Sequence, residues 1–151
     1  MTKERKILKE YSVVILIFAA LSLVRLIVDA CVNGFSTETI PVEGVTEELV
    51  KIAVIIAFVL AHLLLIPNVY VGFKGLKEAK NPTGAREHIV WALVLSIIYL
   101  IATISSVVEI TKGFDIDKLI EILDVAVDTA LFFAYYLTAK KLLAKTNSNS
   151  M

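Results

Sequence analysis

Acidic side chains recur along the last apolar segment of the chain at the spacing of one helix face. Asp117, Glu121, Asp124 and Asp128 are separated by four, three and four residues, which places them on one stripe of a helix. An ionised group inside a membrane-spanning helix costs roughly 2.5 to 3.5 kcal/mol on insertion scales, so it faces a partner or water. The stripe therefore indicates ion pairs or the binding of cations or protons.

Further ionisable groups interrupt the other apolar segments. Arg25 and Asp29 lie one turn apart in the first segment, Lys51 and His62 fall in the second, and Glu109 lies near the end of the third. The predicted ligand-binding or ion-binding candidates are Asp124, Asp128, Arg25, Asp29, Glu121, Glu109, Lys51 and His62.

Arg25 is the cation best placed to neutralise an acid within the membrane. It would lie ~10 Å below the outer end of its helix, and Asp128 would lie ~16 Å below the start of the last helix. We predict a structural ion pair between Arg25 and Asp128, with Asp124 as the alternative partner, because a buried arginine without a partner is costly. Within the predicted helices, five of the acids face only two cations, Arg25 and Lys51; these acids are Asp29, Glu109, Glu121, Asp124 and Asp128. Some of these carboxylates must therefore be solvated, protonated or bound to a cation.

The sequence offers no signature of an enzyme or of a metal centre. His62 has no second histidine at metal-ligand spacing, and the one cysteine, Cys31, has no partner for an internal disulfide. Nucleophile-elbow, HExxH and glycine-rich phosphate-loop motifs are missing. The 15 basic residues equal the 15 acidic ones, which argues against nucleic acid as a partner. We predict no enzyme activity, no cofactor and no metal.

Four apolar segments must position these candidate residues. The chain is 58% hydrophobic and has a mean hydropathy of +0.80, which is typical of a protein embedded in lipid. The predicted helices span 11–33, 47–73, 87–111 and 116–144, each long enough to cross a hydrocarbon core of ~30 Å. We predict one transmembrane domain over 1–151, an all-α integral membrane four-helix bundle, with 145–151 as a flexible tail.

Two proline-containing stretches mark expected irregularities. Pro67 predicts a kink in the last third of the second helix, since proline removes a backbone hydrogen bond. The run Asn81-Pro82-Thr83-Gly84 has turn chemistry and falls within a basic connector predicted over 74–87.

Basic residues gather at three places, and these places determine the expected orientation. They precede the first helix, join the second to the third, and follow the fourth. The residues are Lys3, Arg5, Lys6 and Lys9; Lys74, Lys77, Lys80 and Arg86; and Lys140, Lys141 and Lys145. Short cytoplasmic loops carry an excess of Lys and Arg, so four crossings bring all three groups to the cytoplasmic side. We predict a multi-pass plasma membrane protein with both termini in the cytoplasm.

Two classes of function agree with this pattern. The first is a small membrane protein with an outward-facing acidic pocket that binds or transports a cation, protons or a cationic small molecule. The alternative is a non-transporting interaction or regulatory subunit, in which the buried charges serve helix packing or docking. The expected partners are the lipid bilayer, further copies of the chain in a homo-oligomer, or a partner membrane protein.

Overall fold

The computed structural model describes residues 2–32, 46, 48–49, 52, 55–56, 63–111 and 116–148. Its helices are α1 (Lys3–Val32), α3 (Leu65–Lys80), α4 (Glu87–Ile110) and α5 (Ile116–Ser148). The described part of the chain contains no strand, which confirms the all-helical class.

Three of these helices are long and apolar enough to cross a membrane. The candidate spans are Lys3–Val28, Glu87–Val108 and Lys118–Ser148. The structure describes the predicted helix 47–73 continuously only from residue 63. Helix α3 begins two residues later, at Leu65. Four crossings and the orientation of the termini therefore stay predictions.

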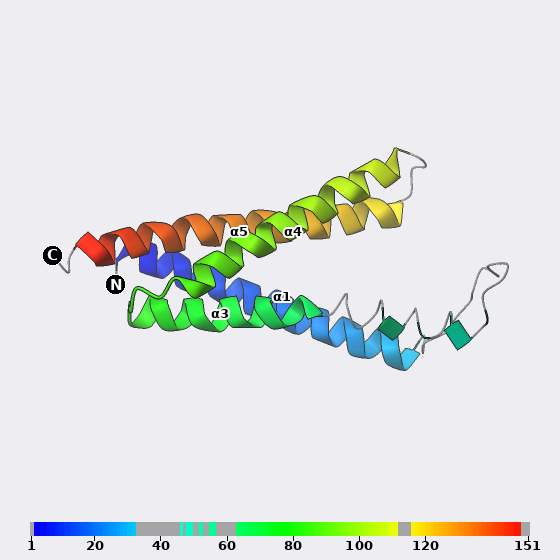
Figure 1. The fold of residues 1–151 in the computed structure, drawn as a ribbon, viewed down its shortest axis with the longest axis horizontal. Coiled ribbons are helices and arrows are strands. Elements are labelled where there is room, and N and C mark those ends of the chain that lie inside the picture. Colours follow the sequence, from blue (N-terminus) through cyan, green and yellow to red (C-terminus); the bar gives the residue numbers. More distant parts are fainter. Residues whose placement is uncertain are drawn as a thin grey trace.

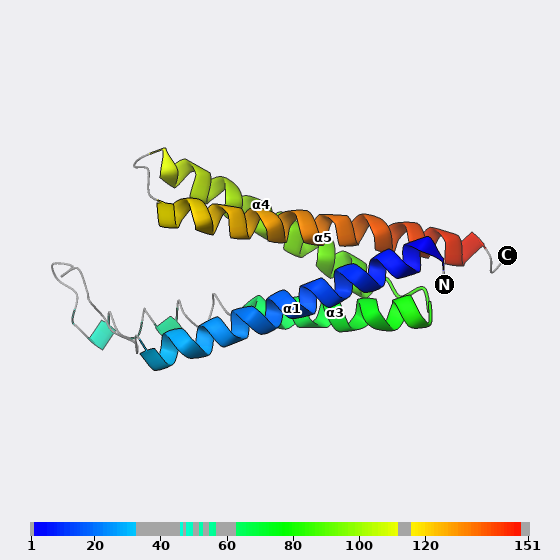
Figure 2. The same cartoon turned by 180° about the vertical axis from the view of Figure 1, so that it is seen from behind.

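The helices form two antiparallel pairs that join at one end of the molecule. α1 packs against α3, α4 packs against α5, and α1 also touches α5. The two pairs diverge toward the other end in both ribbon views (Figures 1 and 2). Both termini and the α3–α4 connection lie at the joined end (Figure 1). The three basic groups of the sequence therefore occupy one end of the bundle.

Among the described residues, the buried core lies at the joined end. The two longest helices, α1 and α5, each bury one stripe of side chains. The buried residues in each stripe are three or four positions apart, which is the spacing of one helix face. These stripes are Leu8, Ser12, Ile15 and Ala19 of α1, and Phe132, Tyr135, Ala139 and Leu142 of α5. Beyond Ala19, large apolar side chains of α1 such as Leu21, Val24 and Val28 are exposed. The diverging half of α1 thus presents apolar surface that lipid or another protein must cover.

Two glycines of α3 allow a close approach between the helices. A Cβ atom added at Gly72 would lie 2.6 Å from Cγ of Leu16. One added at Gly75 would lie 2.3 Å from Oγ of Ser12 and 2.3 Å from Oη of Tyr135. Small residues at such contacts let helix backbones pack tightly in a membrane.

The first helix begins earlier than predicted. α1 starts at Lys3, within the charged segment that precedes the predicted boundary at residue 11. Tertiary contacts stabilise this extra length: Glu4 forms a salt bridge with Lys145, and Nε of Arg5 donates a 2.8 Å hydrogen bond to the carbonyl of Ala79. Arg5 also donates to the carbonyl of Lys80, so it satisfies acceptors at the end of α3.

Helices α3 and α5 end later than the predicted second and fourth helices, 47–73 and 116–144. Residues 74–80, assigned to the connector from sequence, continue α3 as far as Lys80. Residues 145–148, assigned to the tail, are the end of α5. Both corrections have the same physical cause, because each extension contacts the N-terminal turns of α1 through Arg5 or Glu4. The predicted turn is confirmed by Gly84, whose φ of 75° is left-handed.

Candidate functional site

The predicted site residues fall into three groups in the structure. Arg25 and Asp124 are exposed, and Asp128 is partly buried. Residues 29, 109 and 121 belong to α1, α4 and α5, but the side chains of Asp29, Glu109 and Glu121 lie outside the described ones. Lys51 and His62 also lie outside the described residues.

Asp128 stands at the boundary between the core and the diverging part of α5. It lies four residues before Phe132, which is 2% exposed, and it continues the stripe of α5 that is buried at the joined end. Asp124 lies one turn further toward the outer end and is exposed. The two carboxylates repel each other electrostatically. Asp128 is therefore the innermost acid of the predicted acidic stripe, at the edge of the packed core.

A polar link between α3 and α4 lies beside Asp128. Nδ2 of Asn68 donates a 2.7 Å hydrogen bond to Oη of Tyr99. The Tyr99 ring stacks on Phe132 with centroids 5.6 Å apart and an interplanar angle of 21°. Asp128 is close enough to Tyr99 to act on it electrostatically. Three helices thus bring an amide, a phenol and a carboxylate to one level of the bundle, which we name the Asn68–Tyr99–Asp128 layer.

Asn68 has unused hydrogen-bonding capacity. Its Oδ1 atom is buried and has no hydrogen-bond partner among the described residues. Native proteins pair nearly all buried polar atoms, so an unpaired carbonyl oxygen requires an explanation such as a bound ion or water. Amide, phenol and carboxylate oxygens are hard donors that suit small inorganic cations.

The start of α3 explains how Asn68 reaches this position. A turn at Leu64 precedes the helix, and the backbone N–H of Asn68 donates to the carbonyl of Leu64 at 3.3 Å. Pro67 lies in the first turn of α3, where its missing N–H costs little. Leu64 has helical dihedrals, with φ of −67° and ψ of −18°, so the kink expected near Pro67 stays a prediction.

A second buried polar group lies at the joined end and was not predicted. Glu78 and His88 are 6% and 2% exposed. The carboxylate of Glu78 accepts the backbone N–H of Thr83 at 2.9 Å and also accepts the Thr83 hydroxyl. His88 packs edge-on against Tyr135, with centroids 6.0 Å apart. The contacts of Glu78 hold the α3–α4 connection against the end of α3.

Sequence spacing could not reveal this group. Glu78 falls within the segment predicted as a basic connector, 74–87, and His88 lies near the start of the predicted helix 87–111. Both side chains line a cavity of about 10 Å³, which has room for one water molecule at most. Nδ1 of His88 is buried without a hydrogen-bond partner among the described residues. In the described part of the chain, no three His, Cys, Asp or Glu side chains gather as a metal site requires.

The predicted pairing of Arg25 with Asp128 is open to a double-mutant cycle. An ion pair between Arg25 and Asp128 predicts that the effect of Arg25→Ala on thermal stability changes in an Asp128→Asn background. The double variant should then differ from the sum of the single effects by about 1 kcal/mol or more. The same cycle with Asp124→Asn tests the alternative partner. Additive effects in both cycles would eliminate the ion pair.

Comparison with known proteins adds no family to this description. No protein-family model, no curated protein and no solved structure matches the chain. The described part of the chain is all-helical, and three of its helices are long and apolar enough to cross a membrane.

Proposed function

We propose that the protein is a four-span membrane protein that binds a cation at Asp128, within a site open to the outer side. Its termini and the α3–α4 connection would lie in the cytoplasm. The common location of both termini and this connection at one end of the bundle supports an even number of crossings (Figure 1). The basic residues at that end support its cytoplasmic placement.

The observation that carries the proposal is the position of Asp128 in the Asn68–Tyr99–Asp128 layer. A carboxylate at the edge of an apolar core requires a counter-charge or a proton. The buried Oδ1 of Asn68, without a partner among the described residues, offers a neutral oxygen at the same level. One carboxylate with neutral oxygens favours a monovalent cation or a proton over a divalent ion, because a second ligand charge is missing.

The outer ends of the helices support the direction of entry. Continuing the buried stripes of α1, α4 and α5 outward in steps of three and four residues reaches positions 29, 109 and 121. All three positions are acidic in the sequence. The acids at 109 and 121 belong to the α4–α5 pair and the acid at 29 to α1, so both helix pairs would attract cations at the diverging end.

Flux measurements on reconstituted protein test this function. Vesicles that contain the protein and a monovalent cation gradient are expected to lose the gradient faster than protein-free vesicles. An Asp128→Asn preparation should behave like the protein-free control. Binding without flux would restrict the proposal to a cation-binding role, and the lack of both would refute it.

The divergence of the two helix pairs favours a second function, that of an interaction subunit. Apolar side chains in the outer half of α1 are exposed, Val28 by 50% and Ile27 by 53%. A partner helix inserted between the pairs would bury such surface. Co-purification of a second membrane protein from native membranes, lost when Ile27 is replaced by a charged residue, would support this class.

The topology can be tested with matched thiol probes. In a Cys31→Ser background, we expect Asn81→Cys to react with a membrane-impermeant reagent only after the membrane is opened. Thr111→Cys should react in intact cells, because this residue follows α4 at the opposite end. Both native side chains are exposed in the structure, so accessibility reports the side of the membrane. Labelling of Asn81→Cys in intact cells would refute the orientation.

A further inference from the structure

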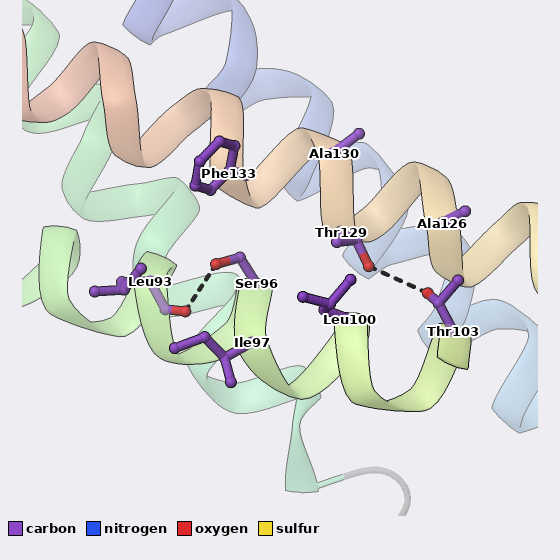
Figure 3. Close-up of a pocket in the computed structure, with 9 residues that line it drawn as sticks. All are labelled: Leu93, Ser96, Ile97, Leu100, Thr103, Ala126, Thr129, Ala130 and Phe133. Atoms are coloured by element: carbon purple, nitrogen blue, oxygen red, sulfur yellow. Dashed lines mark hydrogen bonds between the residues drawn. The ribbon is translucent and has the colours of Figure 1, made fainter. Parts of the chain in front are cut away.

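A groove of about 440 Å³ runs between α4 and α5. Figure 3 shows its lining side chains from the two helices. They are Leu93, Ser96, Ile97, Leu100 and Thr103 of α4, and Ala126, Thr129, Ala130 and Phe133 of α5. The volume is within the range of about 300 to 1,000 Å³ typical of ligand pockets. Asp124 and Asp128, the acidic candidates whose side chains the structure describes, do not line this groove.

The described lining of the groove offers its occupant a mainly apolar surface. The Ser96 hydroxyl donates to the carbonyl of Leu93 at 2.8 Å, and the Thr103 hydroxyl donates to the carbonyl of Tyr99 at 2.8 Å. The hydroxyls of Thr103 and Thr129 also lie 3.3 Å apart, within hydrogen-bond distance (Figure 3). Since these polar atoms already have partners, a polar occupant would lose its own hydrogen bonds with water.

The groove opens on the surface of the α4–α5 pair. Ile97, Leu100 and Phe133 are 48%, 47% and 50% exposed. Tyr99 precedes Leu100 and Phe132 precedes Phe133; Phe132 belongs to the core, Tyr99 packs against it, and the two rings stack on each other. In a membrane, the groove side of the pair is therefore in contact with the acyl chains of lipids.

Cationic side chains stand beyond the inner end of this groove. Steps of four and three residues from Phe133 reach Leu137 and then Lys140, and steps of three and four from Leu93 reach Val90 and then Arg86. The carbonyl of Arg86 accepts the N–H groups of Ile89 and Val90, both at 3.1 Å, so Arg86 continues the helical path of α4.

Arg86 and Lys140 suit the head of an amphiphile rather than its tail. Both are exposed, and Nζ of Lys140 lies 5.7 Å from the centroid of the Tyr136 ring. Each lies about 10 Å along its helix from the nearest groove-lining residue counted above. The groove and the two cations together form a tail site followed by an anion site.

We propose that the groove holds one acyl chain of an anionic phospholipid, whose phosphate is bound by Arg86 and Lys140. The positive charges of Arg86 and Lys140 favour this lipid over a second copy of the chain as the occupant of the groove. A two-fold axis along the membrane normal would bring the cationic ends of both copies together, and their repulsion would oppose a dimer through this face. An anionic head group instead gains roughly 1 kcal/mol for each basic residue near the membrane surface.

Lipid retention by purified protein tests the site. Protein is reconstituted into phosphatidylcholine nanodiscs with or without phosphatidylglycerol, extracted into detergent, and its bound lipid is counted by native mass spectrometry. Wild type is expected to retain phosphatidylglycerol in preference to phosphatidylcholine. Arg86→Gln with Lys140→Gln should lower this preference by about tenfold or more, as expected from the loss of two such cations.

Two matched controls separate the site from general effects of charge and volume. Lys9→Gln with Lys77→Gln removes two exposed cations from the same end of the bundle and should preserve the preference. Ala130→Leu fills the groove and should release the lipid, whereas Ala20→Leu, at an exposed position of α1, should not. Ala126→Leu fills the groove at another point and serves if Ala130→Leu does not fold.

Four results would overturn the proposal. The first is an equal loss of the preference for phosphatidylglycerol in the Lys9→Gln, Lys77→Gln control. The second is retention of lipid by both groove-filling variants. The third is protection of the protein from unfolding by glycerol phosphate as strong as the protection by phosphatidylglycerol. The fourth is a change of oligomeric state in Ala130→Leu without loss of lipid, which would assign the groove to a second copy of the chain.

Discussion

A Gly75→Ala variant is expected to be destabilised by about 3 kcal/mol, or to be lost from the membrane fraction, because overpacking a tight core costs about 1 to 3 kcal/mol and occasionally more. The added methyl group would lie 2.3 Å from two hydroxyl oxygens, those of Ser12 on α1 and Tyr135 on α5. It would also lie 2.7 Å from Cε2 of the Tyr135 ring. The substitution therefore forces α3 away from two helices at the same point.

The surrounding groups cannot yield easily. The Ser12 hydroxyl is fully buried and donates to the carbonyl of Leu8 at 2.7 Å. The Tyr135 hydroxyl donates to the carbonyl of Val71 at 3.2 Å. Displacement of either side chain breaks a buried hydrogen bond in addition to relieving the overlap. Thermal unfolding of detergent-purified protein, with membrane yield as a second readout, measures the loss.

Removal of the two hydroxyls provides the control for this prediction. In a Ser12→Ala, Tyr135→Phe background, Gly75→Ala should cost less than in wild type, because both nearest atoms are gone. The rescue should be partial, since the Tyr135 ring carbon remains. An equal cost in both backgrounds would show that the close approach of α3 to Ser12 and Tyr135 is wrong.

Replacement of Asp128 by asparagine is expected to keep the fold and to abolish cation binding. Asparagine preserves the shape of the side chain and relieves the repulsion between Asp124 and Asp128, so folded yield should equal or exceed that of wild type. A ligand that binds only the folded state stabilises it by about 2.7 kcal/mol at a concentration near 100 times its Kd. Asp128→Asn should lose this entire contribution.

Asp124→Asn is the matched control because it removes the same charge one turn away. Asp124 is exposed and lies outside the Asn68–Tyr99–Asp128 layer, so its substitution should weaken cation binding only modestly through the loss of long-range attraction. Equal effects of the two substitutions would indicate a diffuse acidic surface rather than a site. Protons should compete with the cation in wild type, because a protonated carboxyl carries no charge to bind it.

Membrane-spanning helices could be predicted from sequence where a segment is apolar over its whole length. The segments that contain Ile15, Leu95 and Phe132 are apolar over a span's length, and each lies in a candidate span of the structure. Helix ends were harder to predict because they depend on residues remote in sequence. Arg5 stabilises the end of α3 at Ala79, and no local signal near Lys80 reveals that contact.

The candidate site was likewise predictable where it depends on spacing along one helix, and was missed where it depends on contacts between helices. Helical spacing identified Asp128 as the innermost member of an acidic stripe, which follows from position alone. The partnership of Asn68 with Tyr99 depends on how α3 and α4 pack, so neither residue was among the predicted ligands. Glu78 and His88 were missed for a related reason, since charge and polarity normally indicate exposure, whereas here a turn folds Thr83 onto the carboxylate.

Cation binding by Asp128 is tested most directly by a titration of purified wild type and Asp128→Asn, with unfolding temperature as the readout. Sodium, potassium and a small ammonium ion are each added at constant ionic strength and at neutral pH, with Asp124→Asn in parallel. We expect at least one of these cations to raise the unfolding temperature of wild type and of Asp124→Asn in a saturable manner, and to leave Asp128→Asn unchanged. A wild-type profile that is flat for every cation, or a rise of equal size in Asp128→Asn, would contradict a cation site at Asp128.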